Sequence, residues 1–480
     1  MTMVDRQELL NRLNRYGQQR LIRLYKDLDE ASCTRLASQL ENIDLGQLAR
    51  LCEAVVEEED WADLARQAEP PPALRLSSRR SHDKTEFGWT AKQARQRGGQ
   101  ALDEGKVGVL MTAGGQGSRL GFDRPKGLYP IGPVSGASLL QIHIEKIRAA
   151  ARRHQKSIPL YLMNSPVTVE EQSAFLAEND YFGMTEEDIF LFCQGTMPVV
   201  DAFTGDLLLA TKDTLFLSPD GHGGAVGALA RSGAIESMRR RGIEQLFYFQ
   251  VDNPLVPVCD AEFIGCHLLA NSELTSMAVA KQQPTDKVGN FVGIDKRLQI
   301  IEYSDFPADV AERRAEDGSL QFWAGSIAVH IFSVDFLERS LSLSDALPFH
   351  TARKKVTYLG DEGKVVQPNQ PNALKFERFI FDLLPHAENA LIVEYAEEDC
   401  FAPLKNAPGA ERDTAEYVQR FMINQYHHWL QEAGIQVAGD VAVEISPLWA
   451  LDGMDVVRRV KPGTVIDQTT YLCEDATRLS

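Results

Sequence analysis

Between Lys106 and about residue 281, short apolar runs alternate with longer stretches in which apolar and polar residues are mixed. Short runs rich in Val, Leu, Ile and Phe lack a polar face, which is typical of strands buried on both sides of a sheet. Longer stretches between them repeat apolar residues at helical spacing. The predicted strands are 107–112, 158–164, 189–195, 246–252 and 275–281, and the predicted helices are 137–154, 168–179 and 228–242. This order predicts an α/β fold with a mainly parallel sheet, whose ligands bind at the carboxyl ends of the strands.

The two ends of the chain carry different patterns. Residues 1 to about 68 repeat leucines and tyrosines three and four residues apart, which predicts helices, and the proline-rich stretch 69–81 predicts a linker. Near the C-terminus, the predicted elements are a strand at 389–399, a helix at 413–434 and short β segments over 441–475. We therefore predict a helical segment with linker over 1–80, an α/β domain over 81–385, and a C-terminal segment with a small β-rich domain over 386–480.

Composition narrows the possible partners and the compartment. The net charge of −18 over 480 residues argues against a general nucleic-acid binder, although a local pocket can still attract a small anion. Seven cysteines without a CxxC pair indicate free thiols in a reducing compartment. No apolar run reaches the roughly 18 residues that span a bilayer, and the N-terminus lacks the apolar region of a signal peptide. We expect a cytoplasmic protein that binds neither membrane nor nucleic acid.

A glycine-rich stretch, LMTAGGQGSRLGFDRPKGLYPIG (110–132), follows the first predicted strand. Glycines permit positive φ and close approach of the backbone, and consecutive free amides can form a site for an anion. Arg119 and Lys126 add positive charge for bound phosphates. The stretch therefore predicts a phosphate-binding loop, and the alternative is a strand–turn–helix connection without a ligand.

Two common phosphate motifs do not fit this loop. Counted from Gly115, the third glycine of a GxGxxG dinucleotide fingerprint arrives one residue late, at Gly121. A Walker A loop requires Ser or Thr after its lysine, but Gly127 follows Lys126. The spacing thus disfavours a nicotinamide-dependent dehydrogenase and a P-loop NTPase.

The loop AGGQGSRLGFDRPKG resembles the signature of the eukaryotic-type UDP-sugar pyrophosphorylases, above all the UDP-N-acetylhexosamine pyrophosphorylases. Further blocks resemble this family in the same order along most of the chain: FCQGTMP (192–198), SPDGHGGAVGAL (218–229), VDNPLV (251–256), IIEYSD (300–305), PNALKFERFIFD (371–382), PLKNAPG (403–409) and VEISPL (443–448). The resemblance implies a Rossmann-like nucleotidyltransferase domain with a mainly parallel mixed sheet, between a helical N-terminal segment and a small β-rich C-terminal domain.

The resemblance also implies a reaction. A UTP:sugar-1-phosphate uridylyltransferase makes a UDP-sugar and diphosphate by Mg²⁺-assisted in-line attack of the sugar phosphate on the α-phosphorus of UTP. UDP-N-acetylglucosamine is the expected product. Because the nucleophile is already an anion, such a site needs positioning and positive charge rather than a general base or a covalent intermediate.

Nucleotide-binding residues are carried over from the matching blocks. The resemblance assigns backbone contacts with UTP to Ala113, Gly114, Gly115 and Gly221. It assigns the uracil edge to Gln194, whose amide offers a donor and an acceptor. Asp252, at the end of a predicted strand, is the expected Mg²⁺ ligand. The alternatives are a surface glutamine and an aspartate that caps the following turn.

Catalytic cations are carried over in the same way. Arg119, Lys126 and Lys375 resemble the residues that bind the phosphates, and Lys405 is expected on the sugar side. The alternative for Lys375 and Lys405 is the usual solvated surface lysine.

Departures from the family pattern fall in the sugar-binding blocks. Gly289, Glu302 and Tyr303 match residues on the sugar side, but His222 stands where the acetylhexosamine enzymes carry Asn in PDGNGG. Trp323 and Ser326 stand in WAGS where the family has NAGN. His222 can bond a sugar hydroxyl, and the Trp323 indole can pack on a pyranose face.

Three alternatives to an N-acetylglucosamine enzyme follow from these departures. GHG is also similar to the glucose-type and the broad-range UDP-sugar pyrophosphorylases, so the sugar stays open. A protein that binds a UDP-sugar without turnover is the non-enzymatic alternative. The sequence leaves the oligomeric state open as well.

Overall fold

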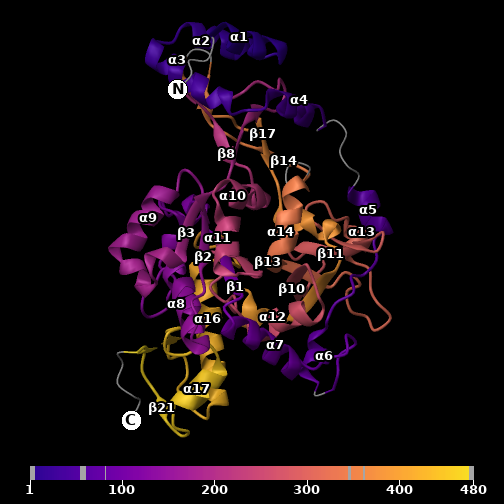
Figure 1. Ribbon diagram of the computed structural model, residues 1–480, viewed down its shortest axis with the longest axis vertical. Coiled ribbons are helices and arrows are strands. Elements are labelled where there is room, and N and C mark those ends of the chain that lie inside the picture. The colour runs from indigo at the N-terminus through magenta and orange to yellow at the C-terminus, as the bar shows by residue number, and fades with distance from the viewer. Residues whose placement is uncertain (1–5, 55–60, 82, 344–346, 361–362, 475–480) are drawn as a thin grey trace. The chain divides into compact units, whose positions relative to one another are not determined.

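The computed structural model describes residues 6–54, 61–81, 83–343, 347–360 and 363–474, and two compact units can be recognised in it (Figure 1). The sheet unit comprises 61–193, 226–343 and 383–480. The helix–hairpin unit comprises 1–60, 194–225 and 344–382. Neither unit is one continuous segment, because long insertions after β3 and after α14 (Val334–Ser340) belong to the helix–hairpin unit. This division differs from the three sequential segments that we predicted.

The sheet unit is built on a nine-stranded sheet in the described part of the chain. Its strand order is β12-β11-β13-β9-β1-β2-β3, and β10 pairs with β13 and β18. The strands are β1 (Val107–Thr112), β2 (Leu160–Asn164), β3 (Ile189–Cys193), β9 (Gln245–Gln250), β10 (Leu274–Ala280), β11 (Gly289–Ile294), β12 (Arg297–Ile301), β13 (Ala324–Ser333) and β18 (Ala390–Tyr395). All six strands predicted in this unit are present within one or two residues at their starts, and the predicted α/β class is confirmed.

Parallel pairing runs from β9 through β1 and β2 to β3, with Thr112 opposite both Gln250 and Met163. The side chains of β1 and β2 are buried throughout, which explains their uninterrupted apolar sequence. The loops that follow β1 and β9 therefore leave the same edge of the sheet side by side.

Strands β11, β12 and β13 are antiparallel to their neighbours and were not predicted. Gly289 pairs with Ser326, and β13 runs antiparallel to β9 with His330 opposite Tyr248. Because β13 and β9 are antiparallel, the start of β13 and the end of β9 lie at the same edge of the sheet. A register shift opposite Ser276 and Ala278 and the positive φ of Ala328 (56°) interrupt the regular period of this region.

Helices surround this sheet. The predicted helices at 137–154 and 168–179 are confirmed, but 228–242 forms two helices because Gly233 adopts φ +77° between them. The helices of the sheet unit and its border are α5 (Trp61–Gln67), α6 (Leu76–Arg80), α7 (Ala91–Asp103), α8 (Leu139–His154), α9 (Val169–Glu178), α10 (Ala225–Arg231), α11 (Ala234–Arg241), α12 (Ala261–Leu269), α13 (Ala308–Ala311), α14 and α15 (Glu397–Cys400).

The predicted linker at 69–81 is an integral part of the sheet unit and packs on β18 and α12. Leu74 is fully buried, and its amide donates to the carbonyl of Ile392 on β18. Arg79 is also buried, and its guanidinium pairs with Glu262 on α12 and lies over the Tyr395 ring. Proline fixes the backbone as extended, but these contacts anchor the segment.

The C-terminal segment contains α16 (Ala415–Glu432), α17 (Gly453–Arg459) and four short strands, β19 (Gln436–Val437), β20 (Val443–Ile445), β21 (Val465–Ile466) and β22 (Thr470–Leu472). The small β elements were predicted, but α17 was not. Its first turn is capped by Asp452, whose side chain accepts from the Asp455 amide.

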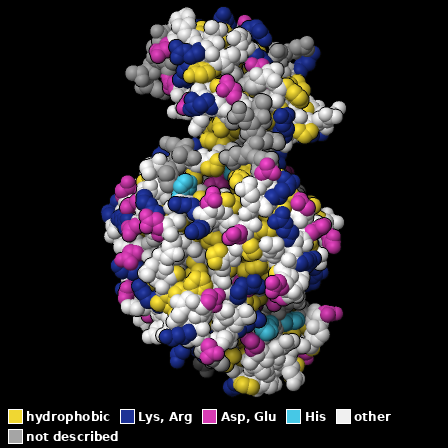
Figure 2. Space-filling model, turned by 90° about the vertical axis from the view of Figure 1, so that its right-hand side faces the viewer, with side chains coloured by type: hydrophobic (Ala, Val, Ile, Leu, Met, Phe, Trp, Pro, Cys, Tyr) yellow, Lys and Arg dark blue, Asp and Glu magenta, His cyan; other side chains and the backbone are white. Residues whose placement is uncertain are grey.

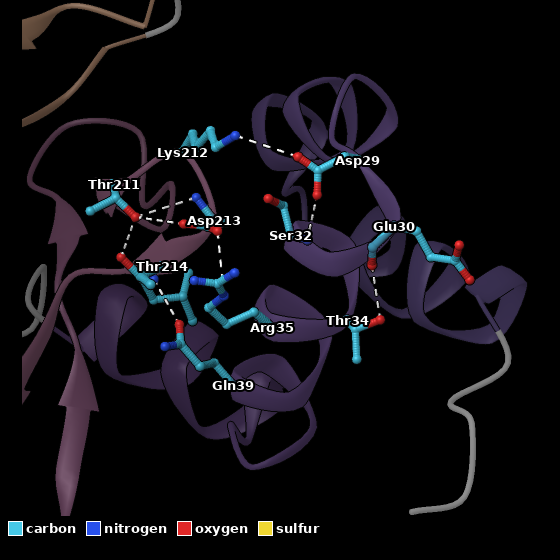
Figure 3. Close-up of polar contacts among 11 residues, drawn as sticks. Asp29, Glu30, Ser32, Thr34, Arg35, Gln39, Thr211, Lys212, Asp213 and Thr214 are labelled. Atoms are coloured by element: carbon cyan, nitrogen blue, oxygen red, sulfur yellow. Dashed lines mark hydrogen bonds and ion pairs between the residues drawn. The ribbon is translucent and has the colours of Figure 1, made fainter.

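The helix–hairpin unit packs N-terminal helices on short hairpins. The helices are α1 (Arg6–Arg15), α2 (Gln19–Lys26), α3 (Glu30–Glu41) and α4 (Leu45–Ala54), and the strands are β4 (Thr196–Pro198), β5 (Val200–Asp201), β6 (Leu209–Thr211), β7 (Thr214–Leu215), β8 (Leu217–Pro219), β14 (His350–Lys354), β15 (Tyr358–Leu359), β16 (Val365–Val366) and β17 (Ala373–Glu377). Figure 3 shows α3 against the β6–β7 turn, where Arg35 pairs with Asp213 and Gln39 accepts from the Leu215 amide.

The surface shows no separation of charges by sign on the face drawn in Figure 2, where acidic and basic side chains are interspersed. Within the described residues, no helix combines the length and the apolar character needed to cross a bilayer.

Candidate active site

The glycine-rich loop after β1 is a closed hairpin. The Lys126 amide donates to the Gly115 carbonyl at 3.0 Å, and the Gly117 amide donates to the Arg124 carbonyl at 2.9 Å. Gly117 has no room for a side chain, because a Cβ there would lie 2.7 Å from the Phe122 ring and carbonyl oxygen. The glycine therefore lets the two arms of the hairpin approach each other closely.

The start of this loop is fixed from α9. Gln172, which is fully buried, donates through Nε2 to the Ala113 carbonyl at 2.7 Å, while the Ala113 amide donates to Met163 of β2. Both polar groups of the Ala113 backbone thus have partners inside the protein. Gln172 could not be identified from the sequence, because one polar residue on an amphipathic helix carries no signal of what it contacts.

Lys126 and Asp252 meet where β1 and β9 end. The Lys126 ammonium lies 3.2 Å from the Asp252 carboxylate and 3.1 Å from the Leu404 carbonyl oxygen, to which it donates. The side chain of Asp252 is 12% exposed. Burial alone would raise the pKa of Asp252, but the charges of Lys126 and Lys405 outweigh it, so the pKa lies below its ordinary value. Asp252 is therefore a carboxylate at neutral pH.

Lys405 is brought to this cluster by an extended segment. The Leu404 amide donates to the Asp252 carbonyl at 2.8 Å, which places the following lysine near the carboxylate. The structure therefore brings Lys126, Asp252 and Lys405 together from three parts of the sequence. Arg119 lies on the same glycine-rich loop, in a single 3₁₀ turn (Ser118–Leu120), with its side chain exposed.

Gly289, Glu302 and Ser326 form a second group in the sheet unit. Gly289 and Ser326 are opposite each other on β11 and β13. A Cβ on Gly289 would lie 2.7 Å from the Ile300 side chain and 3.2 Å from the Glu302 carboxylate. The missing side chain thus leaves the space in which Glu302 sits. Tyr303, the next residue, is 47% exposed.

Trp323 points away from this group. Its carbonyl accepts from the Lys281 amide, so it continues the register of β13 and shares a face with Gly325 rather than with Ser326. The indole is only 8% exposed, and the Arg75 guanidinium lies 3.7 Å from its ring centroid. Arg75 of segment 69–81 thus lies over this indole, a contact that disfavours the predicted packing of the ring on a sugar.

Lys281 is a buried cation that sequence analysis missed. Its ammonium donates to the Asn290 side chain, one residue after Gly289 on β11. Burial lowers the pKa of Lys281 to about 8. Its sequence signal is a lysine at the last position of the predicted strand 275–281, which is also a common place for a solvated charge.

The remaining predicted residues lie in the helix–hairpin unit. Gln194 is its first residue after β3 and is half-buried. Gly221 opens the turn PDGHGG with φ +83°, and a Cβ there would lie 2.3 Å from the Arg378 carbonyl oxygen. Lys375 lies on β17, with its ammonium 6.0 Å from the Phe216 ring centroid. Contacts within this unit bring His222 against the segment 379–381.

His222 is held as a neutral ring. Its Nδ1 accepts from the Ile380 amide at 3.1 Å, and its ring stacks on Phe379 with centroids 5.3 Å apart. Burial, with a smaller effect of His350, lowers the pKa of His222 to about 4. Because Nδ1 is an acceptor, Nε2 carries the proton and is the donor of this ring.

A protein-bound metal cage is not found among the described residues, where no group of three His, Cys, Asp or Glu is placed to bind an ion. Asp252 contributes one buried carboxylate. Mg²⁺ is commonly held by one or two carboxylates together with the phosphates of a substrate and water. The residues present therefore fit a cation that arrives with a nucleotide.

Comparison of the sequence with known proteins shows the family to which the chain belongs. A family described as UTP–glucose-1-phosphate uridylyltransferase matches residues 64–445. A human UDP-N-acetylhexosamine pyrophosphorylase-like protein 1 is 34% identical over 445 residues, which cover 90% of this chain and 87% of the relative. A UDP-N-acetylglucosamine pyrophosphorylase of Saccharomyces cerevisiae is 35% identical over 384 residues, which cover 78% of this chain and 80% of the relative.

Solved structures agree with this assignment. A crystal structure described as a putative UDP-N-acetylglucosamine pyrophosphorylase from Entamoeba histolytica has a TM-score of 0.76 at 30% identity, covering 85% of this chain and 100% of that chain. The fold is also that of the uridine diphosphate N-acetylglucosamine pyrophosphorylase from Trypanosoma brucei, with a TM-score of 0.81 at 24% identity and 99% of both chains covered.

Proposed function

The chain belongs to the UTP–glucose-1-phosphate uridylyltransferase family, which includes the UDP-sugar pyrophosphorylases, and we propose that it joins UTP to N-acetylglucosamine 1-phosphate with release of diphosphate. The observation that carries the proposal is the cluster of Lys126, Asp252 and Lys405 beside a closed glycine-rich loop. Relatives of similar length are named as pyrophosphorylases of N-acetylhexosamines or N-acetylglucosamine.

Bond changes in this reaction need no acid or base from the protein. An oxygen of the sugar phosphate bonds to the α-phosphorus of UTP, and the bond from that phosphorus to the oxygen bridging to the β-phosphorus breaks. The electron pair leaves with diphosphate. Negative charge grows on the leaving group, so fixed positive charge beside it lowers the barrier.

Lys126 and Arg119 supply that charge in our proposal. Lys126 is oriented by two acceptors, so its ammonium is fixed before the substrate binds. Arg119 is exposed on the same loop and is free of the packing that would fix its position. The amides of Gly114 and Gly115 follow Ala113, which Gln172 holds in place.

Asp252 is the residue that would hold Mg²⁺. A bound Mg²⁺ would neutralise charge on the phosphates and hold them in line. In the structure, Lys126 and Lys405 keep this carboxylate ionised. Lys375 and Gln194 complete the proposed set by family resemblance, as a phosphate-binding cation and the residue that reads uracil.

The sugar side is proposed to use Gly289, Glu302, Tyr303 and Ser326. His222 supports a second candidate, a broad-range or glucose-type preference, because its neutral ring presents an N–H where the acetylhexosamine enzymes carry an amide. An amide offers a donor and an acceptor, whereas this ring edge offers only a donor. Trp323 is left out of the proposed sugar site, because the Arg75 guanidinium lies over its ring.

A substrate panel tests the proposal. The protein is incubated with UTP, Mg²⁺ and the 1-phosphates of N-acetylglucosamine, N-acetylgalactosamine, glucose or galactose, and diphosphate release is measured. The expected result is release that is fastest with N-acetylglucosamine 1-phosphate. Faster release with glucose 1-phosphate would select the second candidate. No release with any sugar, together with calorimetric binding of a UDP-sugar, would show a binding protein without turnover.

A further inference from the structure

The turn after β9 lies across a row of polar side chains on α8. The Val251 carbonyl is 3.1 Å from Nε2 of His143. Lys146, three residues further along the helix, donates to the Pro254 carbonyl at 2.5 Å and to the Val256 carbonyl at 2.9 Å. Residues three apart share a helix face, so one face of α8 holds the carbonyls on both sides of Asp252.

His143 and Lys146 can both donate these hydrogen bonds in their uncharged forms. A carbonyl oxygen only accepts, so His143 is protonated on Nε2, and burial together with the charge of Lys146 lowers the pKa of His143 to about 3. Burial lowers the pKa of Lys146 to about 7. The lysine has enough N–H bonds for two carbonyls with or without its charge.

The opposite side of the turn is held as well. Asn253 donates to the Cys400 carbonyl at 2.8 Å and accepts from the Ala402 amide at 3.1 Å. The Asp252 carbonyl accepts from the Leu404 amide. Asp252 therefore sits in a turn clamped between α8 and the segment 400–404, and its carboxylate faces Lys126 at 3.2 Å.

We propose that Lys146 is a positioning residue that fixes the Asp252 carboxylate where it can bind UTP together with a divalent cation. Among His143, Lys146 and Asn253, which hold this turn, Lys146 donates to two carbonyls of the turn, those of Pro254 and Val256, on the C-terminal side of Asp252. Without it, the turn loses two hydrogen bonds and the carboxylate is no longer held in one place before the ligand binds. The inference rests on the proposed function, because it concerns the same nucleotide site.

Calorimetry tests the role of Lys146. The measured quantity is the Mg²⁺ enhancement, which is the ratio of the UTP dissociation constant without Mg²⁺ to that with Mg²⁺. The proteins are the wild type, Asp252→Asn, Lys146→Met and Lys146→Arg. Lys156→Met is the control with the same substitution at an exposed lysine two residues after the end of α8. We expect the Mg²⁺ enhancement to disappear in Asp252→Asn and to fall about tenfold in Lys146→Met, as for other residues that support a metal site. Lys146→Arg should lose less than about threefold, and Lys156→Met should match the wild type.

The outcomes of this experiment separate failure of the inference from failure of the proposed function. A full Mg²⁺ enhancement in Lys146→Met, whatever its thermal midpoint, overturns the inference and leaves the proposed function intact. A full enhancement in Asp252→Asn also overturns it. No UTP binding by the wild type refutes the proposed function and the inference together. If Lys146→Met does not fold, Lys146→Gln decides, because its shorter side chain cannot span both carbonyls and should lose at least about threefold.

Discussion

The ion pair of Lys126 and Asp252 is the central feature of the proposed nucleotide site. Buried charges are costly unless they are paired, and here each partner has further contacts, Lys126 with Leu404 and Asp252 with the field of Lys405. The pair holds the Asp252 carboxylate in its ionised form beside Lys126, at the edge where the loops of β1 and β9 begin. A nucleotide with a divalent cation would be attracted to both charges.

Replacement of Lys126 by Met should leave the fold intact and remove the oriented cation. We expect kcat/KM for diphosphate release to fall about 10²- to 10³-fold, the range for loss of one fixed donor to a developing charge. Arg124→Met is the control on the same loop, since the Arg124 side chain makes a surface pair with Glu171 and such pairs contribute little. Activity of Lys126→Met within about fivefold of the wild type would contradict the catalytic assignment.

Replacement of His222 by Asn should change which sugar is preferred. The amide can both donate and accept, so the ratio of kcat/KM for N-acetylglucosamine 1-phosphate to that for glucose 1-phosphate should rise about tenfold. His428→Asn is a matched control, because that side chain is 60% exposed on α16. An unchanged ranking of sugars would remove His222 as a selector.

Among the helices, α7 and α12 are packed backbone to backbone. A Cβ on Gly98 would lie 1.9 Å from the Ala261 carbonyl oxygen, and one on Gly265 would lie 1.7 Å from the Ala94 carbonyl oxygen. Both helices are capped at their starts, by Thr90 and by Asp260. Side chains at the crossing would push α12 away from α7, and α12 begins shortly after the turn that carries Asp252.

Adjacent glycines on α7 therefore predict opposite effects of the same substitution. Gly98→Ala forces a methyl into the backbone of α12 and should lower the free energy of unfolding by about 3 kcal/mol. Gly99→Ala meets only the edge of His154 at 4.0 Å and should raise it by up to about 1 kcal/mol through helix propensity. Urea unfolding measures both, and equal effects would show that the helices are not in close contact.

The fold as a whole should be sensitive to mild acid through its buried histidines. Nε2 of His267 lies 2.9 Å from the Gln245 side-chain oxygen, to which it donates, and Nδ1 lies 2.8 Å from the Thr275 hydroxyl. Burial lowers the pKa of His267 to about 3. The unfolded chain, with a pKa near 6.5, binds the proton first as the pH falls. The stabilisation is therefore complete above about pH 6.5 and is lost progressively below it.

Unfolding free energies at pH 7 and pH 5 test this dependence. His267 alone should contribute about 2 kcal/mol to the difference between the two values, and His143, with a pKa of about 3, should contribute in the same direction. His267→Asn should reduce the difference by about 2 kcal/mol, whatever its effect at pH 7. An unchanged difference in the variant would show that His267 is not the source.

Prediction from sequence succeeded for whole elements and failed where the pattern was irregular. Strand β1 was predicted to the residue, because six consecutive buried positions leave no other pattern. Strands β11 to β13 were missed, since a register shift and the glycines 289 and 325 break the alternation there. Helix α17 was missed because its apolar Met454 and Val457 are exposed, so no buried stripe marks it.

The sequence by itself determined the family, the glycine-rich loop after β1 and the place of Asp252 just after β9, because those features are carried by contiguous residues and by the ends of regular strands. Only the tertiary structure decided that Trp323 faces Arg75, that Gln172 and Lys146 hold the loops, and that Nδ1 of His222 is an acceptor. The direction and protonation of a side chain depend on partners far away along the chain. No local pattern of apolar and polar residues records those partners.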